Sequence, residues 1–158
     1  MWTAMSAACA RRGCRVAGTE SLRRPSAVAD YLLDTSVLIL HLRGTPEVSA
    51  LLTQWAATQH DLYISTAVRT EVLAGMHPRE EKRTMVLLDS LTSLPVGTAI
   101  ADRAGRLIYD HARRGIQVSF PDALIAATAL EHDLILVTTN VKHFPMLEGR
   151  VRKPFPSG

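Results

Sequence analysis

From Tyr31 onward the chain alternates between short apolar runs and longer stretches with helical spacing. The apolar runs predict strands at 31–33, 62–64, 94–96, 116–118 and 134–137. The stretches between them predict helices at 35–42, 46–57, 66–74, 80–91, 98–114 and 121–132. Strands that alternate with helices form a parallel sheet with helices on both faces. The pattern therefore predicts an α/β fold with a central parallel sheet of about five short strands.

Length and composition fit a single domain of this kind. The chain has 158 residues, of which 47% are hydrophobic and 21% charged, so wholesale disorder, a collagen-like chain and a disulfide framework are excluded. The apolar runs are far shorter than the roughly 18 residues of a membrane span. We therefore expect a soluble, cytoplasmic protein that does not associate with a membrane.

The positive charge is concentrated at the N-terminus. Residues 1–30 contain five arginines against Glu20 and Asp30, and this excess accounts for the whole formal charge of +3. Both cysteines lie in this segment and are too few for a zinc site. Its arginines also interrupt the apolar core that a secretory signal needs. We expect residues 1–29 to form a flexible basic extension and residues 30–158 to form the folded domain.

Polar residues lie where the predicted sheet would bind a ligand. Open parallel sheets bind ligands at the carboxyl ends of their strands. Asp34 follows the first strand, Asn140 follows the last, and Asp122 opens the Ala-rich helix. Glu71 lies beside the buried face of the helix at 66–74, where a carboxylate needs a partner because unpaired burial costs several kcal/mol.

Three of these residues also have a simpler interpretation. Asp34 could cap the helix that begins at residue 35. Asp122 could be the third helical residue of a capping box begun by Ser119. Asn140 could be an ordinary turn residue. By contrast, Asp102 is expected on the solvent face of its helix in an ion-pair ladder with Arg106, and it is left out of the site.

Together, Asp34, Glu71 and Asp122 would place three negative charges at one end of the sheet. Carboxylates that close repel one another unless a cation is present. Oxygen ligands suit Mg²⁺ or Mn²⁺, and the lack of a histidine or cysteine cluster argues against zinc. A metal ion on carboxylates can activate water and neutralise charge on a phosphoryl oxygen. The predicted chemistry is hydrolysis of a phosphodiester or a phosphomonoester.

Four segments, in this order and spacing, resemble a known family. They are Leu32–Leu38 (LLDTSVL), Arg69–Gly75 (RTEVLAG), Asp122–Ala129 (DALIAATA) and Leu136–Asn140 (LVTTN), with Phe144 beyond the last. The sequence resembles the PIN-domain ribonucleases, and most closely the VapC toxins of bacterial toxin–antitoxin pairs. The resemblance covers residues 31 to about 155 and makes the segment 30–158 a PIN domain.

The resemblance implies a PIN-like three-layer sandwich and a metal-dependent endoribonuclease that uses Mg²⁺, with Mn²⁺ as a substitute. Asp34, Asp122 and Glu71 match the family's acidic residues, and Asn140 matches its polar residue after the last strand. Asn140 would join the three acids as a metal residue, and Thr35, Ser36 and Thr138 would support the site by positioning water or metal. One position departs from the family, because His143 precedes Phe144 where an acid is usual. A fourth carboxylate is therefore missing, and a second metal ion is in question.

The family also implies partners. The substrate would be RNA, with tRNA or rRNA as candidates, and Arg113, Arg114 and Lys142 could contact its phosphates. For either arginine alone, an ordinary basic helix end is the first interpretation. A cognate antitoxin and a second copy of the chain would be protein partners. Apolar residues of the early helices could serve these contacts, although burial in the core is expected for most of them: Leu38, Leu42, Leu51 and Trp55.

Two other functions compete with this interpretation. A haloacid-dehalogenase-like phosphatase also has an Asp after its first strand, but it needs a second Asp two residues later, where this chain has Ser36. The other alternative is a non-catalytic PIN-like module that binds RNA or protein while its acidic residues serve as helix caps. The complete acidic trio argues against this module, whereas His143 leaves room for it.

Overall fold

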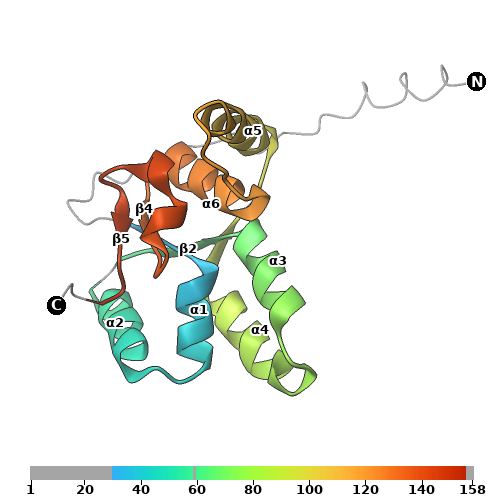
Figure 1. Cartoon of the computed structure of the whole chain (residues 1–158). Helices are drawn as coiled ribbons and strands as arrows, with labels where there is room; N and C mark the ends of the chain where they lie inside the picture. Colours follow the sequence, from blue (N-terminus) through green and yellow to red (C-terminus); the bar gives the residue numbers. More distant parts are fainter. Residues whose placement is uncertain (1–29, 59, 156–158) are drawn as a thin grey trace, which may run out of the picture.

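Five parallel strands form the centre of the protein, whose computed structural model describes residues 30–58 and 60–155 (Figure 1). The strands are β1 (Tyr31–Leu33), β2 (Leu62–Ser65), β3 (Thr92–Leu94), β4 (Ile135–Val137) and β5 (Val151–Arg152). They lie in the order β3-β2-β1-β4-β5, and every neighbouring pair is parallel. The predicted parallel α/β fold is therefore confirmed.

The strand order explains why helices cover both faces of the sheet. The chain moves outward from β1 to β2 and β3 and then crosses back to β4 and β5. Because crossovers between parallel strands are right-handed, a reversal of direction moves the helices to the opposite face. Figure 1 shows α5 and α6 on one side of the sheet and the other four helices on the other side. The six helices are α1 (Thr35–Leu42), α2 (Pro46–Ala57), α3 (Thr66–Gly75), α4 (Glu81–Ser90), α5 (Thr98–Ala112) and α6 (Phe120–Glu131).

Three short 3-10 turns complete the described chain: η1 (Pro78–Glu80), η2 (Val141–His143) and η3 (Pro145–Leu147). The turns η2 and η3 follow β4 and lead to β5, and η3 packs against α6. The segment after β4 therefore lies on the α6 side of the sheet.

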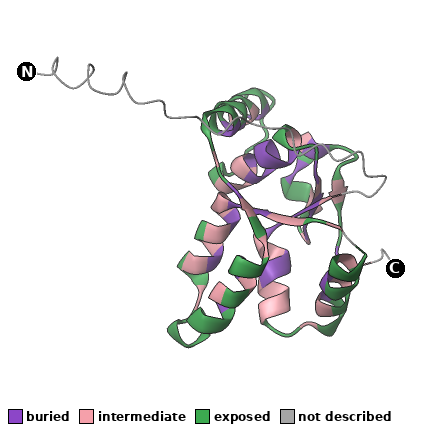
Figure 2. Ribbon diagram, turned by 180° about the vertical axis from the view of Figure 1, so that it is seen from behind, coloured by how far each residue is buried: buried purple, intermediate pink, exposed green. Residues whose placement is uncertain are grey.

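The core consists of the strands and the inward faces of the helices (Figure 2). The central strands β1 and β4 are buried on both faces, as a parallel sheet between two helical layers requires. On α6, the small side chains of Ala123 and Ala127 pack with Ile100 and Ala104 of α5. Small residues at this crossing let the two helices pack closely, so α6 is enclosed between the sheet and α5.

Two of the predicted strands are wrong: one lies at a different position, and the other does not form. The strand predicted at 94–96 lies two residues earlier, as β3. Residues 116–118 form no strand, because Gly115, with φ of +75°, ends α5 and the following backbone bonds back to that helix. There Gly115 N–H donates to Ala112 and Ile116 N–H donates to His111, at 3.0 Å each. The fifth strand is instead β5, which has two residues and is too short to show an alternating pattern.

The apolar residues of the early helices are largely part of the core. Leu38 is fully buried, so its suggested role as a partner contact is wrong. Leu42, Leu51 and Trp55 are half-buried. The expected flexible extension at residues 1–29 lies outside the described residues. Within the described part of the chain, no helix combines the length and apolar character needed to cross a membrane.

Replacing Leu38 with Ala should therefore destabilise the fold. The side chain is fully buried in the main core, and Leu→Ala changes in such positions cost about 2 to 5 kcal/mol. The control is Val86→Ala on α4, where the side chain is 65% exposed and the expected cost is below about 0.5 kcal/mol. Urea unfolding of the two variants measures both values. Equal small losses would contradict the burial of Leu38.

Candidate functional site

The site lies between β1 and β4, where the chain changes the edge of the sheet toward which it adds successive strands. β1 and β4 are neighbours, but the chain leaves them toward opposite edges of the sheet. Such a switch point leaves a crevice at the carboxyl ends of the two strands. Asp34 follows β1 and Thr138 follows β4, so the two residues face each other across this point.

Asp34 uses its carboxylate to join these two strand ends. Its Oδ2 atom accepts hydrogen bonds from the hydroxyls of Ser36 and Thr138, both at 2.7 Å. The residue occupies the N-cap position of α1, but its side chain accepts no cap hydrogen bond. The capping interpretation of Asp34 is therefore wrong, and only 6% of this residue is exposed.

The two hydroxyl donors are themselves held by backbone groups of the loop after β4. The N–H of Thr139 donates to Ser36 Oγ at 3.2 Å, and the N–H of Asn140 donates to Thr138 Oγ1 at 3.0 Å. These hydrogen bonds connect the first turn of α1 to the loop that leads into η2. The orientation of the Asp34 carboxylate therefore depends on both segments.

Glu71 reaches the site from the middle of α3. Ser65 is the N-cap of this helix, and its side chain accepts a hydrogen bond from the N–H of Ala67; the helix buries Val68 and Val72. This orientation leaves Glu71 half-buried, as its place beside the apolar face predicts. Its Oε2 atom accepts a hydrogen bond from Thr35 Oγ1 at 2.5 Å. Thr35 is the residue after Asp34, so this contact places Glu71 next to the first acidic residue.

Asp122 lies in the first turn of α6, whose N-cap is Ser119. Ser119 Oγ accepts the Asp122 N–H at 3.2 Å and donates to Asp122 Oδ2 at 2.6 Å. The predicted capping role of Ser119 is thus present, while the Asp122 carboxylate remains beside the site. The Nδ1 atom of His143, at the end of η2, lies 3.5 Å from the same oxygen. This pairing of His143 with Asp122 was not predicted, and the only signal was its place in the sequence before Phe144.

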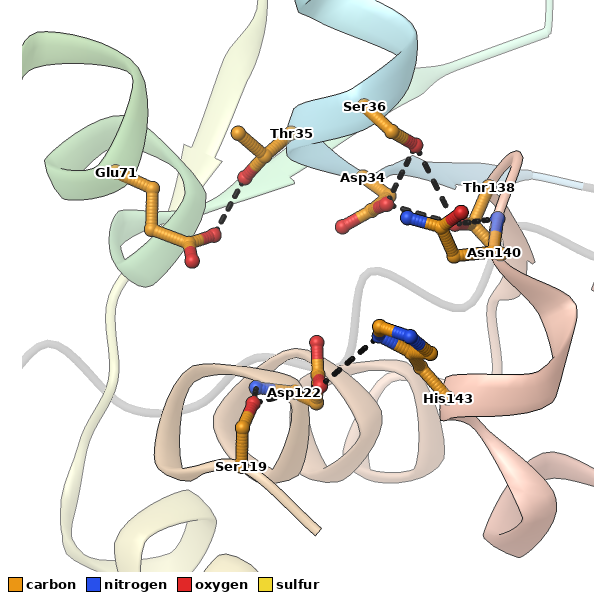
Figure 3. A network of polar contacts seen from close by, with 9 residues as sticks. All are labelled: Asp34, Thr35, Ser36, Glu71, Ser119, Asp122, Thr138, Asn140 and His143. Atoms are coloured by element: carbon orange, nitrogen blue, oxygen red, sulfur yellow. Dashed lines mark hydrogen bonds and ion pairs between the residues drawn. The ribbon is translucent and has the colours of Figure 1, made fainter. Parts of the chain in front are cut away.

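Figure 3 shows that the three carboxylates point toward a common space, with Asn140 and His143 at its border. On each carboxylate the hydrogen bonds reach one oxygen only, and no described residue donates to the other. Among the described residues, no Lys or Arg forms an ion pair with these three acids, and each carboxylate keeps one oxygen with free lone pairs.

The acidic residues remain separate rather than forming a closed cage. Over residues 30–58 and 60–155, no three His, Cys, Asp or Glu side chains form a group that could hold a metal ion as they stand. A cation shared by all three carboxylates would therefore require their side chains to move together. Such movement is open to Glu71 and Asp122, which are half-buried, more than to Asp34.

The basic residues predicted to contact RNA lie at two different places. Lys142 is exposed on η2, between Val141 and His143. Arg113 and Arg114 are exposed at the C-terminal end of α5, and neither contacts the acidic residues. Arg113 donates to the Tyr109 hydroxyl at 3.0 Å and lies over the Tyr109 ring, which fits an ordinary helix end.

Asp102 is exposed on α5, as expected for a residue outside the site. In the described part of the chain it forms no ion pair with Arg106, so the predicted ladder of ion pairs is wrong. An exposed pair of this kind gains little, because solvent screens the attraction and the long side chain loses entropy.

The fold and the site together define a three-layer α/β protein with an acidic ligand site at the switch point of its sheet. Comparison with known proteins identifies the family within this class. The chain matches the PIN domain family over residues 31–146. It is 39% identical to Ribonuclease VapC10 of Mycobacterium tuberculosis over 124 residues, which cover 78% of this chain and 92% of that protein. It is 38% identical to Ribonuclease VapC19 of the same organism over 117 residues, or 73% and 92% of the two chains.

Solved structures show the same architecture. A toxin–antitoxin complex from Klebsiella pneumoniae contains a chain with a TM-score of 0.68 and 29% identity, and the match covers 81% of this chain and 100% of that one. VapBC2 of Rickettsia felis, bound to a promoter DNA fragment, matches at a TM-score of 0.68 and 21% identity over 78% and 97% of the chains, which supports the fold. The protein therefore belongs to the PIN domain family, and within that family to the VapC ribonucleases.

Replacing Thr138 with Val should destabilise the protein, because Val removes a buried hydroxyl. The change leaves Asp34 Oδ2 with one donor fewer and the Asn140 N–H without its acceptor, at an expected cost of about 1 to 3 kcal/mol. Thr138→Ser keeps the hydroxyl and should lose less stability. Denaturant unfolding of both variants provides the comparison. A Ser variant less stable than the Val variant would show that the methyl group, and not the hydroxyl, matters here.

Proposed function

We propose that this protein is the toxin of a toxin–antitoxin pair and that it acts as a metal-dependent endoribonuclease. The observation that carries the proposal is the set of three carboxylates at the switch point, each with one oxygen held by a hydroxyl and the other free. The relatives named as ribonucleases support the reaction. A non-catalytic binding module is not favoured, because Asp34 does not serve as a helix cap and Asp122 keeps a free oxygen.

The donor set fits a hard divalent cation such as Mg²⁺, for which Mn²⁺ can substitute. Asp34, Glu71 and Asp122 would supply carboxylate oxygens, and the exposed Asn140 lies at the border of the same space (Figure 3). Their negative charge is uncompensated by Lys or Arg among the described residues, which favours a cation. When bound, such an ion supplies an activated water and neutralises charge on a phosphoryl oxygen.

The protein's own residues have separate tasks in this proposal. Ser36 and Thr138 hold Asp34 in one orientation, and Thr35 does the same for Glu71. His143 lies within reach of Asp122, at the position where the family usually has an acid, so its imidazole can contact a phosphate oxygen of the substrate. Lys142, exposed beside it, adds positive charge on the same side.

An antitoxin partner is supported by two solved relatives, one described as a toxin–antitoxin complex and one as a member of the VapBC family of toxin–antitoxin systems. We assign this protein an antitoxin as its inhibitor and a second copy of the chain as its partner in a homodimer. Its substrate would be RNA, with tRNA or rRNA as candidates, and a 25% identical relative from Shigella flexneri is named a tRNA(fMet)-specific endonuclease. An enzyme with this substrate and inhibitor would act in the cytoplasm.

Metal binding can be measured without cleavage. Mg²⁺ or Mn²⁺ should stabilise the protein by about 2.7 kcal/mol at one hundred times its dissociation constant. Asp34→Asn should abolish this gain, because the substitution removes one of the charges that hold the ion. Asp102→Asn, an exposed acidic residue away from the site, should keep it. Thermal unfolding with and without the ion gives the result, and equal gains in both variants would exclude the proposed ligands.

Cleavage tests the proposed activity directly. The full chain should cut total cellular RNA into discrete fragments with Mg²⁺ or Mn²⁺ and leave it intact in EDTA. Asp34→Asn and Asp122→Asn should lower the rate by more than about 100-fold, while Asp102→Asn should match the unmodified protein. Gel electrophoresis of end-labelled RNA shows the fragments. Intact RNA under every metal condition, with folded protein, would favour the binding module instead.

A further inference from the structure

A hollow lies between α2 and the segment that contains β5. Its volume is about 540 Å³. Its walls include Gln54 and Trp55 of α2, Val141 of η2, and Arg152, Lys153 and Phe155 near the C-terminus. The hollow therefore joins three parts of the chain that are distant in sequence, and none of its lining residues is among the three acids.

The charge of this hollow is positive. Arg152 and Lys153 are exposed, and none of the lining residues is acidic. In the described part of the chain neither cation forms an ion pair with a carboxylate. Lys142 follows the lining residue Val141 and adds a further positive charge nearby. An anionic occupant would complement this surface, whereas the basic segment 1–30 of the same chain would not.

An aromatic ring in the wall is held firmly in place. Trp55 stacks on Tyr31 with ring centres 4.1 Å apart and an angle of 17° between planes. The Arg152 guanidinium donates to the Tyr31 hydroxyl at 3.1 Å, which connects the cation to the same ring stack. Aromatic rings beside cations and a side-chain amide are the usual means of binding unpaired bases and their phosphates. A nucleotide therefore fits the chemistry better than an acidic peptide, which needs no ring.

One wall residue of the hollow, Val141, is adjacent in sequence to the acidic site. Val141 directly follows Asn140, whose N–H bonds to Thr138, and η2 ends at His143 beside Asp122. A strand of RNA with one phosphate at the carboxylates would pass over η2 to reach Trp55 and Arg152. The 3-10 turn η2 therefore contributes Val141 to the hollow and His143 to the acidic site.

We propose that this hollow is a subsite for a nucleotide of single-stranded RNA, with the base against Trp55 and Phe155 and the phosphates on Arg152 and Lys153. The inference rests on the proposed function in taking RNA as the substrate. It gives the enzyme a contact away from the bond that is cut, which would help to select where the RNA lies in the site.

The test is the binding of a fluorescein-labelled, mixed-sequence RNA of about 12 nucleotides, followed by anisotropy, which fits the site sizes of single-strand binders. The full chain carries Asp122→Asn so that the RNA stays intact. Adding Arg152→Gln and Lys153→Gln should weaken binding at least tenfold. The two changes should also reduce the slope of log affinity against log salt concentration by about 1.4, because each phosphate contact to single-stranded RNA contributes about 0.7. The matched control is Lys82→Gln with Arg83→Gln, two exposed neighbouring cations on α4, which should change affinity less than twofold.

A second measurement reports on the ring itself. The chain has two tryptophans, so Trp2→Phe leaves Trp55 as the only source of indole fluorescence. Titration with the same unlabelled RNA should quench Trp55. Unchanged affinity in the Arg152/Lys153 variant would overturn the subsite, and so would the absence of quenching. Quenching by poly-glutamate and not by RNA would also overturn it and would point to an acidic protein partner.

Different results would refute the proposed function and the proposed subsite. Protein that binds RNA through the hollow but cuts none under any metal condition would refute the proposed function and leave the subsite standing. Metal-dependent cleavage together with unchanged RNA binding in the Arg152/Lys153 variant would refute the subsite alone.

Discussion

The two hydroxyl hydrogen bonds to Asp34 Oδ2 are the interaction on which the rest of the site depends. They come from Ser36 in α1 and Thr138 after β4, so they connect the carboxyl ends of β1 and β4. The chain leaves these two strands toward opposite edges of the sheet. A carboxylate that is 6% exposed would be costly without such donors. The donors are neutral hydroxyls rather than cations, and they occupy one oxygen only, so the other faces the common space of the site.

Glu71 and Asp122 repeat this arrangement on other elements. Each accepts a hydroxyl hydrogen bond on one oxygen, from Thr35 and Ser119 respectively, and has no described donor on the other. Orientation by neutral hydroxyls differs from orientation by Lys or Arg, because a salt bridge would cancel the charge that attracts a cation. The site is therefore ordered without being neutralised. This distinction separates an acidic ligand site from an ordinary surface ion-pair network.

Hydrophobic periodicity, glycines and prolines are sufficient to predict the helices closely, and the rule for parallel sheets identifies the acidic positions. Sequence alone could not separate a strand at 116–118 from the extended backbone that closes α5, because both contain a short apolar run. It also could not exclude Asp34 as a helix cap, since the competing donor Thr138 is 104 positions away. The hollow that Trp55 and Arg152 both line was equally hidden, because it depends on β5, whose two residues give no pattern.

In the proposed function, the three carboxylates at the switch point bind one divalent cation together. Anomalous X-ray diffraction from crystals grown with Mn²⁺ tests it most directly, because the signal locates the metal independently of activity. We expect a peak bound by the free oxygens of Asp34, Glu71 and Asp122, with the Ser36 and Thr138 hydrogen bonds to Asp34 retained. A peak elsewhere, or carboxylates that remain apart at saturating Mn²⁺ with no peak between them, would contradict it.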